Sequence, residues 1–138
     1  PPRGTPYSRE EVLDAVAAAF PLLELVQSRY ADHKIVAPGE GMADNIAHHG
    51  YVVGADVADW RRQDLPNLAV RQSYGGAVQV EQKGGNPSVD PVLPLVWLAK
   101  HLHGLGEHLR AGQVVTTGTY TGCIFVPPGQ RVVAARSL

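Results

Sequence analysis

One carboxylate, Glu24, lies within an otherwise apolar run from Pro21 to Val26. A carboxylate that is buried without a partner is unfavourable by several kcal/mol, so a residue in this setting requires a positive neighbour or water. Three arrangements are open: an ion pair with Arg29 or another basic residue, a strand whose Glu24 face meets solvent, or coordination of a divalent cation. From the residues alone these alternatives stay open.

Two further segments carry groups that could bind or react. The turn from Thr116 to Gly122 is rich in hydroxyls and glycine, so its backbone N–H groups could hold a carboxylate or phosphate. It is not a P-loop, because it has no lysine and no following helix, and an ordinary β-turn explains it equally well. Asp44 lies in a glycine-punctuated loop, where it could be an acid/base group, a polar anchor or a local cap.

The six histidines and the single cysteine do not form a recognisable transition-metal motif. His101 and His103 are two positions apart on a predicted helix and therefore point to different sides. His48 and His49 are adjacent and diverge likewise, and no histidine stands at zinc-site spacing from Cys123. We expect histidines at the surface or in hydrogen bonds, and Cys123 as a small core residue.

The elements that must position these residues follow from local patterns. Ser8 and Glu11 form a capping-box pattern, and apolar residues then recur at helical spacing up to Phe20, where Pro21 ends the helix. A second helix is expected from Asp90-Pro91 to about Gly104. Strands are expected at 22–27, 51–54, 68–72, 77–82, 113–117, 123–126 and 131–135, with one short helical turn near 42–48.

Composition restricts the class of protein. The 138 residues suit one domain, and 44% apolar with 18% charged residues is an ordinary globular balance. A net charge of −1 gives no basic field for nucleic acid or an anionic membrane, and no apolar run reaches the roughly 18 residues that span a bilayer. One cysteine excludes an internal disulfide and suits a reducing cytoplasm. The residues predict a small mixed β domain with two packed helices.

In chain order, these segments resemble the 2-keto-4-pentenoate hydratase and 4-oxalocrotonate decarboxylase family of the fumarylacetoacetate hydrolase superfamily. The segment Pro21 to Tyr30 is similar to its "PALE…SR" motif, and Ala43 to Ala47 to its "ADN-x-A" motif. Gly85-Asn86-Pro87 with the following helix resembles "G-x-P…AVAWLA", and the segment 105–119 resembles "LG…GD-V-V-L-TG-S/T". The resemblance covers about Tyr7 to Leu138 and implies the C-terminal half of a catalytic domain spanning 1–138 here, with an α+β, mixed-sheet fold.

The resemblance also implies a chemistry. Glu24 matches the third of three carboxylates that hold Mg²⁺ or Mn²⁺, and the other two belong to a Glu-x-Glu motif expected before Pro1. The metal would chelate a small 2-oxo or 2-hydroxy dienoate acid and stabilise its dienolate. Gly118 and Thr119 match a turn that grips the substrate carboxylate, and Arg29 and Asp44 match substrate-binding and catalytic motif positions.

The expected activity is hydration of a 2-hydroxy-2,4-dienoate in aromatic meta-cleavage catabolism, with decarboxylation of an oxalocrotonate as the alternative. The family resemblance implies a homo-oligomer, and the single cysteine fits a cytoplasmic location. Gln113 and Gln130 stand where the family usually has Asp, in what we expect to be turns. The segment Ala47-His48-His49 replaces a more usual stretch of small residues. With one metal carboxylate in the sequence, a non-catalytic or truncated subunit is a further alternative.

Overall fold

The computed structural model describes residues 4–32 and 35–136, which form two compact units. The first unit comprises the described residues up to Ala19 and those from Val57 onward, and the second runs from Phe20 to Asp56. Helices together with antiparallel sheets confirm the predicted α+β class. The strand pairs of the described residues are all antiparallel, so the predicted mixed sheet is not found there, and the single catalytic domain stays a prediction.

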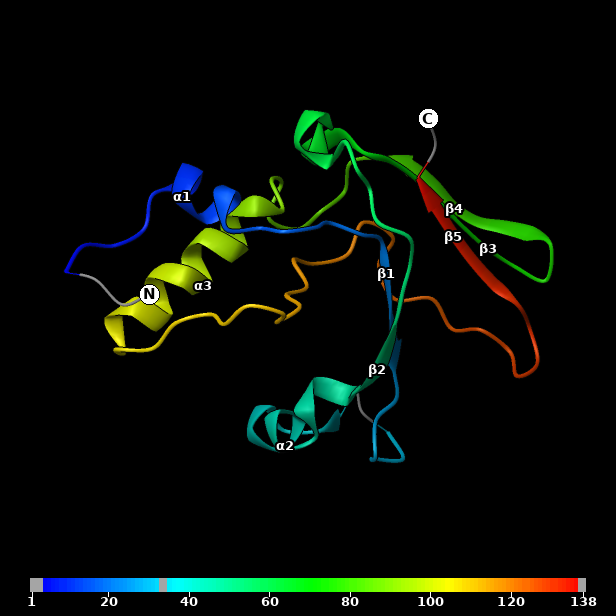
Figure 1. The fold of residues 1–138 in the computed structure, drawn as a ribbon. Coiled ribbons are helices and arrows are strands. Elements are labelled where there is room, and N and C mark those ends of the chain that lie inside the picture. Colours follow the sequence, from blue (N-terminus) through cyan, green and yellow to red (C-terminus); the bar gives the residue numbers. More distant parts are fainter. Residues whose placement is uncertain (1–3, 33–34, 137–138) are drawn as a thin grey trace. The chain divides into compact units, whose positions relative to one another are not determined.

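The core of the first unit lies between its two α-helices, α1 (Arg9–Asp14) and α3 (Val92–Gly104) (Figure 1). Helix α1 begins with the predicted capping box, in which Ser8 Oγ accepts from Glu11 N and the Glu11 carboxylate accepts from Ser8 N. Its apolar side buries Val12 against Val92 and Val96 of α3. Two packed helices were expected, and this contact confirms them.

Helix α1 is shorter than its apolar stripe predicted, because it ends at Asp14 rather than near Phe20. The side chain of Arg61 donates to the carbonyl oxygens of Leu13 (3.2 Å) and Val16 (2.8 Å). These carbonyls would otherwise accept the N–H groups of the next helical turn. A guanidinium from a distant part of the chain therefore helps to end the helix, and Pro21 is not the terminator.

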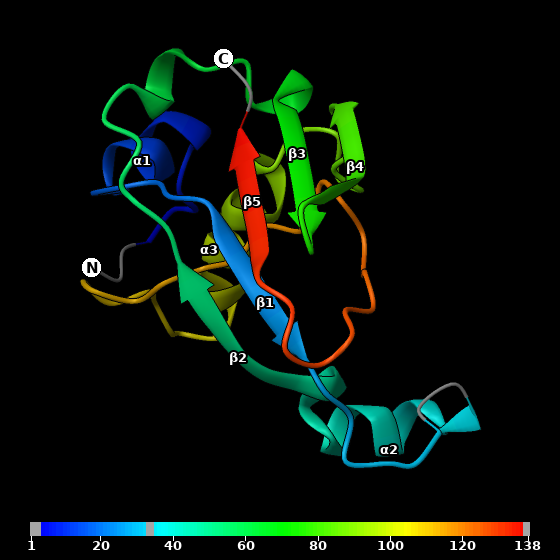
Figure 2. The same ribbon diagram turned by 90° about the vertical axis from the view of Figure 1, so that its right-hand side faces the viewer.

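The sheet of the first unit has the antiparallel order β4-β3-β5 (Figure 2). Strands β3 (Ala69–Tyr74) and β4 (Ala77–Lys83) form the hairpin predicted around Gly75-Gly76. Strand β5 (Val132–Arg136) pairs with the other side of β3, with Gln72 opposite Ala134. Two short 3₁₀ turns, η3 (Trp60–Arg62) and η4 (Leu65–Asn67), precede the hairpin.

Two of the predicted strands are absent. The segments 113–117 and 123–126 carry β-branched and aromatic residues, but neither is assigned as a strand or paired with another described segment. A strand exists only where a neighbour completes its hydrogen bonds, so residue preference alone does not produce one. Cys123 is exposed rather than in a core, which corrects the expectation for it.

The second unit is built on the antiparallel pair β1 (Leu22–Val26) and β2 (His48–Val53), drawn in blue and green in Figure 2. Between them lie helix α2 (Pro38–Ala43) and the 3₁₀ turn η2 (Asn45–Ala47). Among the described residues of this unit, Asp44 alone is buried. Its interior is therefore organised around a carboxylate rather than around an apolar cluster.

Within the described residues, no helix combines the length and apolar character needed to cross a membrane.

Candidate functional site

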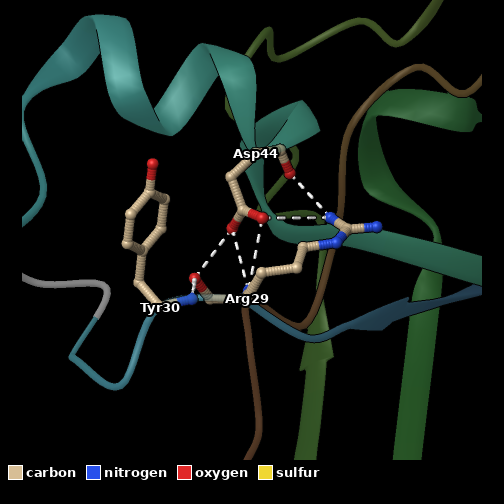
Figure 3. A network of polar contacts seen from close by, with 4 residues as sticks. Arg29, Tyr30 and Asp44 are labelled. Carbon is tan, nitrogen blue, oxygen red and sulfur yellow. Dashed lines mark hydrogen bonds and ion pairs between the residues drawn. The ribbon is translucent and has the colours of Figure 1, made fainter.

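Asp44 is the centre of a polar network that joins two motif segments of the second unit (Figure 3). Its carboxylate accepts hydrogen bonds from Ser28 Oγ at 2.7 Å, from the backbone N–H of Arg29 at 3.2 and 3.3 Å, and from Arg29 Nη1 at 3.3 Å. Arg29 Nη1 also donates to the backbone carbonyl of Asp44 at 2.7 Å. Ser28 Oγ in turn accepts from Tyr30 N, which fixes the segment that follows β1.

These donors act on the charge state of Asp44. The hydrogen bond from Ser28 lowers the pKa of Asp44, opposed by burial, and the backbone N–H and side chain of Arg29 lower it further. The carboxylate is therefore ionised at neutral pH. Only 4% of its side chain is exposed, whereas 57% of the Arg29 side chain is exposed. Asp44 thus holds Arg29 in one orientation while most of the guanidinium faces solvent.

The backbone directly after Asp44 is strained. Asn45, Ile46 and Ala47 have φ values of 54°, 53° and 58°, so three consecutive non-glycine residues adopt the left-handed conformation. Each such residue costs roughly 1–2 kcal/mol, with asparagine the most tolerant and a β-branched residue the least. The turn places Asp44 O to accept from Ala47 N and directs Ala47 O to Gln27 N. Backbone strain of this kind is concentrated at functional sites.

Ile46→Gly is expected to raise the free energy of unfolding by up to about 1 kcal/mol. Glycine adopts the left-handed conformation without strain, but its greater freedom in the unfolded chain offsets part of this stabilisation. Ile46 is 78% exposed, so little apolar burial is lost. Urea denaturation measures the change. Val52→Gly, at an exposed position of β2 in extended backbone, is the matched control and is expected to destabilise; an equal loss in both variants would contradict the strain.

Glu24 is not buried: of the arrangements that the sequence left open, the structure shows a strand whose Glu24 face is partly exposed. It lies in β1, where Glu24, Leu25 and Val26 are exposed, and 46% of its side chain is accessible. Its Oε1 lies 2.8 Å from His48 Nδ1, the diagonal neighbour on β2. Of the basic partners that the sequence left open for Glu24, Arg29 is bound to Asp44 instead, and His48 is the one beside Glu24. His48 accordingly belongs to the hydrogen-bonded histidines that the sequence predicted.

The described residues do not by themselves form a metal site. No group of three or more His, Cys, Asp or Glu side chains among them lies close enough to hold an ion. Hard divalent cations require several oxygen ligands, and Glu24 with its histidine neighbour offers one carboxylate. The chemistry implied for Mg²⁺ or Mn²⁺ thus needs oxygen ligands from outside this described set.

The third candidate, the loop around Gly118 and Thr119, lies in the first unit. Thr119 Oγ1 accepts from the backbone N–H groups of Thr121 and Gly122, both at 3.1 Å, so this hydroxyl stabilises its own turn. The backbone N–H groups of Gly118 and Thr119 donate to no other residue that the structure describes. The donors of this loop that can reach an external anion are therefore backbone groups rather than the threonine hydroxyl.

Three residues that contact these candidates were not selected from the sequence as site residues: Ser28, His48, and Asn86, whose Nδ2 donates to the Thr117 carbonyl at 3.1 Å. Ser28 is part of the "SR" motif and Asn86 of the "G-x-P" motif, so motif membership was the signal that could have identified both. His48 had no such signal. Its contact with Glu24 depends on the register of β1 against β2, in which Val26 is opposite His48.

Known proteins resemble this chain over most of its length. No family model matches it. A 4-oxalocrotonate decarboxylase of a Pseudomonas species is 33% identical over 123 residues, covering 86% of this chain and 45% of that protein. A 2-keto-4-pentenoate hydratase of Paraburkholderia xenovorans strain LB400 is 34% identical over 122 residues, with 88% and 45% covered. A 2-hydroxyhexa-2,4-dienoate hydratase of Comamonas testosteroni is 30% identical over 129 residues, with 94% and 48% covered.

Solved structures give the same relationship. The 4-oxalocrotonate decarboxylase from Pseudomonas putida G7, complexed with magnesium and adipate, superposes with a TM-score of 0.78 at 28% identity, over 93% of this chain and 48% of that one. Its complex with calcium and acetate gives 0.76. The resemblance predicted from the motifs is confirmed: the chain is homologous to these hydratases and decarboxylases. It spans about half the length of the curated relatives it matches, which is consistent with a C-terminal half.

Proposed function

We propose that this chain is the C-terminal part of an enzyme that adds water to a 2-hydroxy-2,4-dienoate, a hydro-lyase reaction in the catabolism of aromatic ring-cleavage products. The observation that carries the proposal is homology, at 30–34% identity, to hydratases and decarboxylases over 86–94% of the chain. The polar network of Asp44 supports it, because it joins the two motif segments "SR" and "ADN-x-A" by direct hydrogen bonds. The fold is proposed to be of the fumarylacetoacetate hydrolase type.

The proposed roles follow from the charges and the available donors. Arg29 binds a substrate carboxylate, since its Nε and Nη2 donate to no other described residue while Nη1 is fixed by Asp44. The backbone of Gly118 and Thr119 supplies N–H donors to a carboxylate. Asp44, ionised at neutral pH, acts as a proton acceptor or as the fixed anion that orients Arg29.

Glu24 is proposed as one oxygen ligand of a divalent ion, Mg²⁺ or Mn²⁺, whose other ligands lie outside the described residues. The related decarboxylase structures contain magnesium and calcium, both of which prefer oxygen ligands. Glu24 is half-exposed and lies beside a histidine rather than in an arginine pair, so its carboxylate is accessible to an ion. A bound ion of this kind supplies positive charge to an oxygen on which negative charge develops.

Hydration and decarboxylation are separated by their products. The native protein that contains this chain is incubated with a 2-hydroxy-2,4-dienoate and with an oxalocrotonate, in the presence of Mg²⁺, and the products are identified by mass. The expected result is a product that has gained one water from the dienoate. Loss of CO₂ from the oxalocrotonate without hydration of the dienoate would contradict the hydratase proposal and support decarboxylation as the activity.

A second candidate is a non-catalytic or truncated subunit that keeps this fold and supports an oligomer with a catalytic chain. The observation that favours it is the incomplete metal site among the described residues. The same incubation distinguishes the two candidates, because a non-catalytic chain turns over neither acid when purified alone. In that case, addition of this chain to a catalytic relative would be expected to change the assembly size measured by light scattering.

A further inference from the structure

The loop from Thr117 to Gly122 is held in place by side chains that have no role in the proposed chemistry. We propose that Asn86 is a positioning residue for this loop, fixing the backbone N–H groups of Gly118 and Thr119 toward the carboxylate of a small organic acid. This inference rests on the proposed function for the identity of the ligand. The part that concerns the shape of the loop stands on contacts within the first unit.

Asn86 is 5% exposed, and both ends of its side-chain amide are used. Its Nδ2 donates to the backbone carbonyl of Thr117 at 3.1 Å, and its Oδ1 accepts from the backbone N–H of Ser88 at 2.9 Å. The two partners require opposite ends of the amide, because turning it over would place Oδ1 against a carbonyl oxygen. Asn86 therefore connects the segment before α3 to the first residue of the loop in one orientation.

Gly118 lies directly against this amide. Its φ is +96°, and a Cβ at this position would stand 3.3 Å from Asn86 Nδ2. A side chain would be strained by the backbone conformation and would also press on the amide. The absence of a Cβ lets Asn86 pack against the loop backbone. The backbone N–H groups that directly follow Thr117, those of Gly118 and Thr119, donate to no other described residue.

The other end of the loop is fixed independently at Tyr120. Gln82 Nε2 donates to the Tyr120 carbonyl, and the Tyr120 hydroxyl donates to Leu65 O at 2.7 Å. Burial, with a smaller contribution from the charge of Asp90, raises the pKa of Tyr120, so the phenol keeps the proton that it donates. Gly85 gives room for this arrangement, since a Cβ there would stand 3.1 Å from Tyr120 O.

Gly118 and Thr119 consequently lie between two anchors, Asn86 at Thr117 and Gln82 with Leu65 at Tyr120. Successive backbone N–H groups in a turn bind anions, and they do so more tightly when no ordering of the loop is required on binding. The ligand chemistry that fits is a carboxylate rather than a bulkier polyanion, because the loop offers neutral donors and no lysine or arginine of its own.

The test uses Asn86→Asp, which keeps the size and the acceptor for Ser88 and removes the donor to Thr117. Heteronuclear ¹H–¹⁵N NOE values report the order of the 117–120 amides, and adipate, titrated into the same samples, reports carboxylate affinity. We expect lower NOE values confined to this loop and affinity about tenfold weaker, the size of one lost hydrogen bond. Asn67→Asp is the matched control, since among the described residues Asn67 Nδ2 donates within its own turn, to Asp64.

The outcomes separate the two proposals. Unchanged loop order in a folded Asn86→Asp protein would overturn the positioning role. A loosened loop in a protein whose wild type binds no adipate would leave that role standing and count against the carboxylate site. Should the variant fail to fold, the wild type decides: slow exchange of the Asn86 side-chain NH₂ protons supports the bond to Thr117 O, and exchange as fast as that of an exposed amide overturns it.

Discussion

Glu24→Gln is expected to weaken Mg²⁺ binding by the native protein at least tenfold and to lower its turnover by a similar or larger factor. Glutamine has nearly the same size as glutamate, but its neutral amide oxygen replaces a negative ligand of a hard cation. Removing a group that is only hydrogen-bonded to a metal ligand lowers metal affinity or activity about 10–100-fold. Removing a ligand itself should lower them by at least as much. Isothermal titration calorimetry with Mg²⁺ and with Mn²⁺ measures the change.

The structure offers a matched control for this experiment. Glu81 is another exposed glutamate on a strand, in β4 opposite Arg71, so Glu81→Gln removes the same charge at a site without a proposed ligand role. The contact of Glu24 with His48 is partly exposed, and such pairs contribute about 0–1 kcal/mol, so the fold should tolerate the change. Equal Mg²⁺ affinity in both variants and the wild type would exclude Glu24 as a ligand.

Asp44→Asn is expected to lower the thermal midpoint by several degrees and to reduce turnover strongly. The new amide nitrogen would face donors, because Ser28 Oγ and two nitrogen atoms of Arg29 all point at the carboxylate. A buried donor left without an acceptor is unfavourable. Here the hydrogen bonds are lost at Asp44, the one buried residue among the described residues of the second unit. Differential scanning calorimetry and the product assay measure the two effects.

The lowered pKa of Asp44 also predicts how the stability of the protein depends on pH. The pKa of Asp44 is lowered in the folded state, first by the Ser28 hydrogen bond, below the value of about 3.9 for an unfolded aspartate. Its stabilising contribution is therefore complete above about pH 4 and is lost as the pH falls through the lower folded value. Urea denaturation between pH 7 and pH 3 should show the wild type and Asp44→Asn converging in acid.

Asp56→Asn is the control for that pH series, because Asp56 is an exposed aspartate of the same unit. This control should follow the wild type throughout. A constant gap between wild type and Asp44→Asn down to pH 3 would show that the carboxylate is not held by charge-sensitive hydrogen bonds.

The elements that local sequence predicted correctly are those whose decisive contacts are local. The capping box joins Ser8 to Glu11, and the β3–β4 hairpin turns at Gly75-Gly76. Helix α3 begins after Asp90-Pro91, where Asp90 Oδ1 accepts from Val92 N. Each contact spans at most a few positions, so residue type and order are enough to define it.

The errors concern contacts between distant residues. The end of α1 depends on Arg61, and the missing strands at 113–117 and 123–126 lack a neighbouring strand within the described chain. The apolar neighbours of Glu24 left open whether it is buried, and the structure places it in a two-stranded sheet whose residues there are exposed. Burial is a property of what covers a residue, and the residues beside it in sequence do not determine it.

The sequence by itself determined which family this chain resembles and which motif positions carry Glu24, Arg29, Asp44 and the Gly118–Thr119 turn. Only the tertiary structure decided how the charges are paired. Arg29 binds Asp44 rather than Glu24, and His48, 24 positions away in the sequence on the neighbouring strand, lies beside Glu24. By charge alone, several basic groups could pair with either carboxylate. Which group does so depends on the strand register and on the strained turn after Asp44, because these bring particular side chains within hydrogen-bonding distance.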